Sequence, residues 1–309
     1  MHFYIFILFF SIFSYVKAFE NINFIFDFSY VGRDKDIYSV DDEHSDFMMN
    51  KDKGFNLNYG ELSISYPVEK GIKLKGVFHL TEESFEIGEL YFFTGDTFRL
   101  KGGKFRSSVG ILNERHQHEW EFSDIPVFYQ SFFGYHALTE KGIQVSYHHK
   151  YIISGFEILQ GENEYSFGKG KGDLFTFFVK GNLPYIKPVF SYLDGGFRED
   201  QSSGRTRMIF TGAEISSFKN VRFQGEYAYR IKEGDKSSGY YIQMVYSAEK
   251  AVETGLRYGY VENGEYRYSG MITFRFSEYI KLRAQYNYYR SQINEFILEL
   301  TFKTGEDEH

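Results

Sequence analysis

After position 19, apolar and polar residues alternate along nearly every stretch of about ten residues, the length of a membrane-crossing strand. The last stretch places Phe296, Leu298 and Leu300 on one side and Glu299 and Thr301 on the other. Alternation with period two is typical of a β-strand whose two faces meet different surroundings. The sequence offers no helical segments to cover so much apolar surface. We therefore expect an all-β, antiparallel, up-and-down transmembrane barrel with lipid outside and water inside.

The pattern predicts sixteen strands, an even number as in bacterial barrels. They cover residues 20–31, 54–66, 70–80, 84–94, 97–105, 140–149, 151–160, 173–181, 184–193, 205–215, 219–231, 238–247, 250–260, 264–276, 278–290 and 293–303. Fourteen strands are the alternative, because the second and fourth strands each break the alternation. In the second strand, the slip falls across Gly60-Glu61, and a β-bulge would explain it.

The predicted connectors alternate between short and long, as expected for short turns at one rim and longer outer loops at the other. The longer ones are 32–53, 106–139, 161–172, 194–204 and 232–237. No linker or helical period divides the chain, so we expect one closed domain. Closure would also leave no unpaired strand edge in the hydrocarbon of a membrane.

The start of the chain resembles a leader for export. Residues 3–16 are almost all apolar, and Val16 and Ala18 put small residues before Phe19. A run of this length is too short for a comfortable membrane helix and is typical of a secretory signal. We expect a signal peptide at 1–18, a barrel at 19–309 and a location in the bacterial outer membrane.

Aromatic residues form 20% of the chain, with 27 Tyr and 35 Phe. A barrel in lipid uses such residues for its outer band and for the girdles at both membrane interfaces. Cysteine is absent, so disulfides and thiolate chemistry are excluded. The high aromatic content thus leads us to expect outer-membrane lipid around the strands.

The predicted inward face is rich in bases. It carries Lys73, Lys75, Arg99, Lys101, Arg222, Arg230, Arg257, Arg267, Arg275, Lys281, Arg283 and Lys303, against the acids Asp27, Glu226, Glu253, Glu265, Glu295 and Glu299. The whole chain has a net charge of −7, and loss of Lys17 with the leader makes it −8. Unpaired charges in a dry interior would each cost several kcal/mol, and sixteen strands enclose more space than side chains fill. Both arguments favour a water-filled pore with a basic wall, although each base could instead pair with an acid and brace the wall.

Residues 106–139 are the longest connector, and loops of such length are commonly functional or disordered. Composition argues against disorder, because Trp120, Phe122, Phe128 and other aromatic residues need a surface to pack on. We expect this loop to fold into the lumen as a constriction. Its candidate residues are Arg106, Glu114, Arg115, His116, His118, Glu119, Glu121 and Asp124. Acids on such a loop, opposite a basic wall, would screen solutes by size and charge.

We expect the loop to cover the wall near its root, at Lys73, Lys75, Arg99 and Lys101. Bases across the barrel, at Arg257, Arg267 and Arg283, are then expected to face the open passage. By the same assignment of faces, Leu282 points to lipid and Gln285 to the lumen, so Gln285→Arg should be tolerated. Because the wall bases outnumber the wall acids, we expect a mild preference for anions.

Residues 103–116, GKFRSSVGILNERH, resemble a segment of bacterial outer-membrane porins loosely of the phosphate-selective type, with a pattern near G-K-F-x-x-P-F-G-I-x-N-E-x-H. Trp120 and the stretches 124–126 and 132–134 continue the likeness, and Ser108-Val109 stands where the group tends to have Pro-Phe. The resemblance implies a sixteen-stranded porin, often a homotrimer, whose third outer loop folds inward. The lysine ladder of phosphate-selective members cannot be mapped here, so phosphate specificity is not implied.

The sequence contains little else that suggests chemistry. His116 and His118 lie two residues apart on an extended segment, which would place both imidazoles on one side. Histidines in loops beside acids are more commonly solvated, however, so we predict no metal site and no cofactor. An acidic chain without a basic aromatic surface gives no support for nucleic-acid binding.

Two functions remain. The first is a channel, not an enzyme, through which small hydrophilic or anionic solutes diffuse passively. The alternative is a barrel-scaffold hydrolase, a lipase or protease, for which Ser123 with His116 or His118 would have to supply the catalytic groups.

Overall fold

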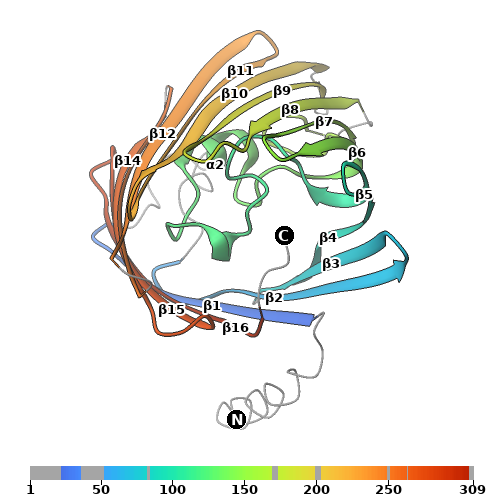
Figure 1. Cartoon of the computed structure of the whole chain (residues 1–309). Coiled ribbons are helices and arrows are strands. Elements are labelled where there is room, and N and C mark those ends of the chain that lie inside the picture. Colours follow the sequence, from blue (N-terminus) through green and yellow to red (C-terminus); the bar gives the residue numbers. More distant parts are fainter. Residues whose placement is uncertain are drawn as a thin grey trace.

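A computed structural model describes residues 22–35, 52–81, 84–168, 173–198, 203–248, 251–262 and 264–305. The described chain forms one closed antiparallel barrel of sixteen strands, and the ring closes between β1 and β16 (Figure 1). The strands are β1 Ile22–Arg33, β2 Gly54–Glu69, β3 Ile72–Leu80, β4 Phe85–Thr94, β5 Phe98–Arg106, β6 Thr139–His149, β7 Ile152–Leu159, β8 Leu174–Gly181, β9 Ile186–Arg198, β10 Ser203–Phe218, β11 Val221–Lys232, β12 Asp235–Ala248, β13 Val252–Val261, β14 Tyr266–Arg275, β15 Ile280–Tyr289 and β16 Asn294–Lys303.

The prediction of sixteen strands is confirmed, and the fourteen-strand alternative is wrong. Both breaks in alternation are β-bulges. In β2, Asp27 pairs with Tyr59 but Phe28 pairs with Leu57, which leaves Asn58 as the extra residue. The slip thus lies before the predicted Gly60-Glu61 step, and it turns Tyr59 and Glu61 inward, where both are buried. In β4, the extra residue is Gly88.

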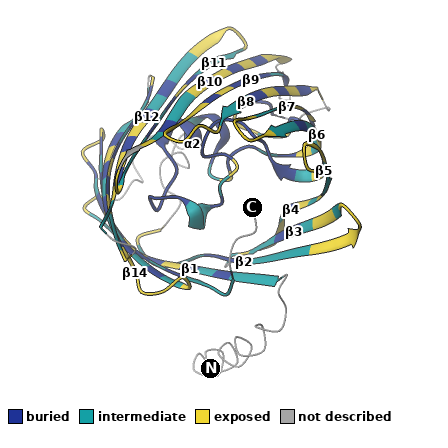
Figure 2. Cartoon of the chain, viewed as in Figure 1, coloured by how far each residue is buried: buried dark blue, intermediate teal, exposed yellow. Residues whose placement is uncertain are grey.

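Buried and more exposed residues alternate along many of the strands, as the sequence pattern predicts (Figure 2). Outward residues such as Leu256 and Tyr286 are exposed, whereas the inward residues Arg257 and Gln285 beside them are buried. Neighbouring strands keep this arrangement in register, because Tyr286 pairs directly with Phe296, another exposed aromatic residue. The barrel therefore presents an apolar outer surface and a polar inner one.

Two loops predicted to be long are mostly strand. The expected loop 194–204 belongs largely to β9 and β10, where Asp194 pairs with Arg207. The expected loop 232–237 is reduced to the turn Glu233-Gly234 between β11 and β12. Both turn residues have positive φ, 53° and 99°, the conformation of tight hairpin turns. The alternation pattern did not reveal these strand ends, because their residues are mostly charged or polar. Both faces of a strand can be polar where it projects beyond a membrane.

Two helical segments lie between β5 and β6: the 3₁₀ helix η2, Gln117–Glu119, and the α-helix α2, Val127–Phe133. No helix in the described ranges is long and apolar enough to cross a membrane. The predicted signal peptide at 1–18 lies outside the described residues, as do the acidic residues 41–43 and the end of the tail at 306–309.

Candidate functional site: the barrel interior and the β5–β6 segment

Residues 107–138, here called the β5–β6 segment, contact the inner face of the barrel through aromatic side chains. Figure 1 shows α2 within the ring of strands. Phe133 stacks on Phe210 of β10 with ring centroids 5.6 Å apart, and Phe128 stacks on Tyr241 of β12 at 6.0 Å. These rings are fully buried in one apolar cluster. Aromatic packing of this kind buries large areas and fixes the position of α2 against β10 and β12.

Asp124 joins the β5–β6 segment to the opposite wall. Its carboxylate accepts hydrogen bonds from Arg257, Gln285 and Asn287 and forms an ion pair with Arg267, whose Nη1 lies 2.9 Å from Oδ2. All five side chains are buried. Burial by itself raises the pKa of Asp124, but Arg267 and Arg257 outweigh this and hold the pKa below its ordinary value. The aspartate therefore stays ionised between two guanidinium groups.

Backbone carbonyls of the same segment accept further hydrogen bonds from the wall. Arg283 donates to the Trp120 carbonyl at 2.7 Å and also pairs with Glu299 at 3.0 Å. Lys281 donates to the His118 carbonyl at 2.9 Å. Both of these wall bases thus meet a carbonyl or carboxylate instead of open water.

These contacts correct two expectations. Arg257, Arg267 and Arg283 do not face an open passage, because they are 4%, 2% and 1% exposed beneath the β5–β6 segment. Gln285 is not a free lumen position either, since it accepts from the Ser123 amide at 2.7 Å and donates to Asp124. The physical reason is the length of the segment, which extends from its root at β5 and β6 to contacts with β13, β14 and β15.

The root of the β5–β6 segment is held by two buried wall acids. Glu226 of β11 accepts from the Ile111 amide at 3.0 Å and from the Tyr129 hydroxyl at 2.9 Å. Gly110 has φ +63°, a conformation that other residues adopt only with strain, and a Cβ there would displace the Glu226 carboxylate, which would lie 2.2 Å away. Glu157 of β7 accepts from Ser107 and from the Ser108 amide. Sequence reasoning missed Glu157, although an acid within an apolar β7 was a detectable signal.

Two more acids of the segment form ion pairs, whereas Glu119 accepts a hydrogen bond from the His116 amide at 2.7 Å. Glu121 lies 2.8 Å from Arg222 and 3.3 Å from Arg115, while Arg115 also reaches Glu214 at 2.8 Å. Glu114 pairs with Lys180 of β8. Two predicted wall bases have other contacts. Arg275 pairs with Glu253, and Arg230 lies over the Phe132 ring, 4.3 Å from its centroid.

The larger inner hollow lies on the side of the barrel where the loop was expected to cover the wall. It is a cavity of about 730 Å³ that includes the turns before β3 and β5 in its lining. Its bases are Lys70, Lys73, Lys75, Arg99, Lys101, Arg106 and Lys180, and its acids are Glu69, Glu89, Asp96 and Glu114. The predicted wall residues of the first strands therefore line open space instead of lying beneath the segment.

A second hollow, of about 450 Å³, has the opposite balance. It is lined by Arg115, Arg222 and Arg275 and by the acids Glu114, Glu119, Glu121, Glu214 and Glu253. Glu114 lines both hollows, so the β5–β6 segment separates a basic region from an acidic one.

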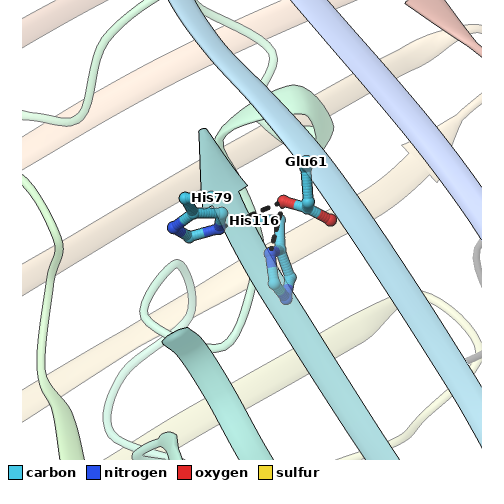
Figure 3. A group of neighbouring side chains, drawn as sticks. All are labelled: Glu61, His79 and His116. Carbon is cyan, nitrogen blue, oxygen red and sulfur yellow. Dashed lines mark hydrogen bonds and ion pairs between the residues drawn. The ribbon is translucent and has the colours of Figure 1, made fainter. Parts of the chain in front are cut away.

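His116 and His118, noticed in the sequence as a pair, lie beside groups from three strands. Figure 3 shows Glu61 of β2, His79 of β3 and His116 with both imidazoles turned toward the carboxylate. Glu61 Oε2 is 3.2 Å from His116 Nδ1 and 3.4 Å from His79 Nε2. Burial lowers the pKa of His116, but the neighbouring Glu61 more than compensates and raises it to about 9. The sequence could not reveal this cluster, because Glu61 and His79 lie far from the loop along the chain.

Comparison with known proteins identifies one relative by sequence. An uncharacterized protein of Aquifex aeolicus (strain VF5) is 32% identical over 373 aligned residues, which cover 94% of this chain and 79% of that protein. No protein-family model matches the chain.

Solved structures share the fold at low sequence identity. An anion-selective porin from Comamonas acidovorans has a TM-score of 0.71 at 9% identity, over 91% of this chain and 98% of that one. The outer membrane channel DcaP of Acinetobacter baumannii has a TM-score of 0.61 at 12% identity, over 92% and 96%. The trimer form of OmpT, an outer membrane protein of Vibrio cholerae, has 0.62 at 8%, over 92% and 98%. The sequence match with the Aquifex aeolicus protein, by its identity and coverage, shows that the chain belongs to the same family as that protein.

Proposed function

We propose that this protein is a porin of the bacterial outer membrane, a water-filled channel through which small hydrophilic solutes diffuse, with a mild preference for anions. The closed ring supports a membrane location, because every strand is paired and no edge is exposed to lipid. The outward band of exposed aliphatic and aromatic residues supports it too. The solved porins with this fold agree with the proposal but show the fold alone.

The observation that carries the proposal is the basic hollow. Seven bases against four acids line it, in a protein whose whole chain has a net negative charge. Charges on the walls of a confined aqueous space raise the local concentration of the opposite ion. We infer that the hollow attracts anions and that the β5–β6 segment narrows the passage beside it, which would screen solutes by size.

The hydrolase alternative gains no support from the contacts. Ser123 Oγ is buried without a hydrogen-bond partner among the described residues. His116 and His118 instead lie around Glu61, at 3.2 and 3.9 Å. A serine nucleophile needs a base within hydrogen-bond reach, and Ser123 has none in the described chain.

Measurements of reversal potential in planar bilayers under a salt gradient test the proposal. The test variant replaces Lys73, Lys75, Arg99 and Lys101 with glutamine at the same time. It would leave three bases against four acids in the hollow, so the anion preference should disappear. The reason is electrostatic, and the shift should therefore be larger at 0.1 M salt, where the Debye length is about 10 Å, than at 1 M, where it is about 3 Å.

The matched control neutralises four exposed bases outside both hollows, at Lys141, Arg205, Arg207 and Lys236. We expect it to leave the reversal potential nearly unchanged. Equal shifts from the two variants would mean that the hollow does not carry the selectivity. A wild-type protein that conducts no ions would contradict the channel itself.

We also propose a homotrimer, which the resemblance of residues 103–116 and the solved trimer form of OmpT support. Light scattering of the detergent-solubilised protein would measure the mass of the assembly directly. A mass of one chain would contradict the trimer without affecting the channel.

A further inference from the structure

Two strands and the β5–β6 segment bring one carboxylate and several imidazoles together inside the barrel. Glu61 and His79 are directly opposite each other in the pairing of β2 with β3, and His116 reaches them from the β5–β6 segment (Figure 3). The ligating atoms of Glu61, His79 and His116 all lie within 4.8 Å of one another. His118 Nδ1 is 3.9 Å from the same carboxylate oxygen. The cluster is largely buried, and His116 also lines the edge of the basic hollow.

A second carboxylate orients His116. Nε2 of His116 lies 2.9 Å from Oε1 of Glu89. Glu89 is itself fixed by the Arg106 amide, which donates to its other oxygen at 3.3 Å. With a carboxylate beside Nε2, Nδ1 is the ring nitrogen that faces Glu61 and would bind a metal, as in the carboxylate–histidine–metal arrangement of many metal sites. Without a metal, a proton on Nδ1 would occupy the 3.2 Å gap to Glu61, and a metal ion would displace that proton on binding.

We propose that Glu61, His79 and His116 bind a divalent transition-metal ion such as Zn²⁺, with His118 near the remaining position. Two imidazoles and a carboxylate are a usual ligand set for zinc, with metal–ligand bonds of about 2.0–2.2 Å. In a tetrahedron, such bonds place neighbouring ligand atoms about 3.3–3.6 Å apart. The distances of 3.2 and 3.4 Å from Glu61 to the two imidazoles are close to that spacing. All three ligand atoms already lie within 4.8 Å of one another.

A metal here would join the β5–β6 segment to the wall formed by β2 and β3. Asp124 and the buried arginines hold the far side of the segment, whereas His116 lies on the near side, beside the basic hollow that it also lines. The bound ion would thus tie down the side of the segment that faces the open space. Metal binding requires no channel activity, so it can be tested whether or not the protein is a channel.

Isothermal titration of ZnCl₂ into the chelator-stripped, tag-free protein in detergent tests this. We expect one ion per chain. His79→Ala and His116→Ala should each weaken binding at least tenfold. Glu89→Gln should weaken it about 10- to 100-fold, as does the loss of a group that orients a metal ligand. His149→Ala is the matched control, because His149 lies at the end of β6, stacked on Tyr147 and apart from the cluster, and it should bind like the wild type.

Two further measurements keep the test decisive. Each variant is checked for a closed barrel by its gel shift between unheated and boiled samples, so lost binding is not mistaken for lost folding. Co²⁺ should give the visible absorption of a four-coordinate site in the wild type and lose it in His79→Ala. Absence of binding by the wild type, or wild-type affinity in folded His79→Ala and His116→Ala, would overturn the proposal.

Discussion

At the scale of single residues, Asp124 joins the β5–β6 segment to two buried arginines of the wall. It lies 3% exposed between Arg257 and Arg267, which are also buried. Removal of one partner from a buried ion pair leaves the other charge uncompensated, which costs more than the pair itself contributes. Two guanidinium groups would be left without a carboxylate if Asp124 were neutral.

We predict that Asp124→Asn lowers the free energy of unfolding by about 3–5 kcal/mol. Denaturant titration of the detergent-solubilised protein, followed by circular dichroism, measures the change. The control is Glu162→Gln, because Glu162 and Lys141 form an exposed pair, 46% and 63% exposed, and such pairs contribute about 0–1 kcal/mol. Similar losses in the two variants would show that Asp124 is not a special anchor.

The depressed pKa of Asp124 sets the direction of a pH effect. Since its folded pKa lies below the ordinary value of 3.8, ionised Asp124 stabilises the fold fully above that pH. This contribution is lost as the pH falls through the folded pKa. We predict that the difference in stability between wild type and Asp124→Asn is constant near neutral pH and shrinks below pH 3.8. A difference that grows with acidification would contradict the assignment.

At the scale of the element, a strand of this barrel has one face for lipid and one for the interior. In β15, Leu282 points outward between Lys281 and Arg283, both buried. A charge placed on the lipid face must either stay in hydrocarbon or distort its surroundings. Its cost depends on depth.

We predict that Leu282→Arg destabilises the folded barrel by about 2–4 kcal/mol if the residue lies near the middle of the membrane. Phe276→Arg is the control, because Phe276 is 67% exposed just beyond the end of β14, where the cost falls to about 0–1 kcal/mol. For both variants, the yield of the heat-modifiable folded form in lipid vesicles measures the effect of the substitution. Equal yields would place Leu282 outside the hydrocarbon region.

At the scale of the whole molecule, the β5–β6 segment divides the interior of one closed barrel. Deletion of residues 114–124 would remove Glu114, Glu119, Glu121 and Asp124 but only one strong base, Arg115. Arg257 and Arg267 would then lose their contacts with Asp124, and Arg283 would lose its contact with Trp120. The interior would become both wider and more positive.

We predict that this deletion raises single-channel conductance and moves the reversal potential further toward anions. The gel shift between unheated and boiled samples must persist, since the sixteen strands do not pass through the deleted residues. Unchanged conductance in a closed barrel would mean that the segment does not narrow the passage.

The alternation of residue types along the chain by itself determined most of the fold. It specified sixteen strands and one closed domain, because a strand between lipid and water must repeat with period two. It failed where this constraint is absent. The ends of β9, β10 and β12 are largely polar and resembled loops. The bulge in β2 lies at Asn58, before the Gly60-Glu61 step where the sequence pattern placed it.

The sequence also indicated which residues of the candidate site are charged and which connector is unusual, but not how they meet. The alternation along each strand shows which charged residues face inward, so a basic inner wall was predictable. Which bases line open space depends on where the β5–β6 segment lies, and packing of Phe128 and Phe133 against β10 and β12 decides that. The Glu61, His79 and His116 cluster likewise needs the pairing of β2 with β3. Only the tertiary structure decided these contacts, because they join residues whose separation along the chain carries no periodic signal.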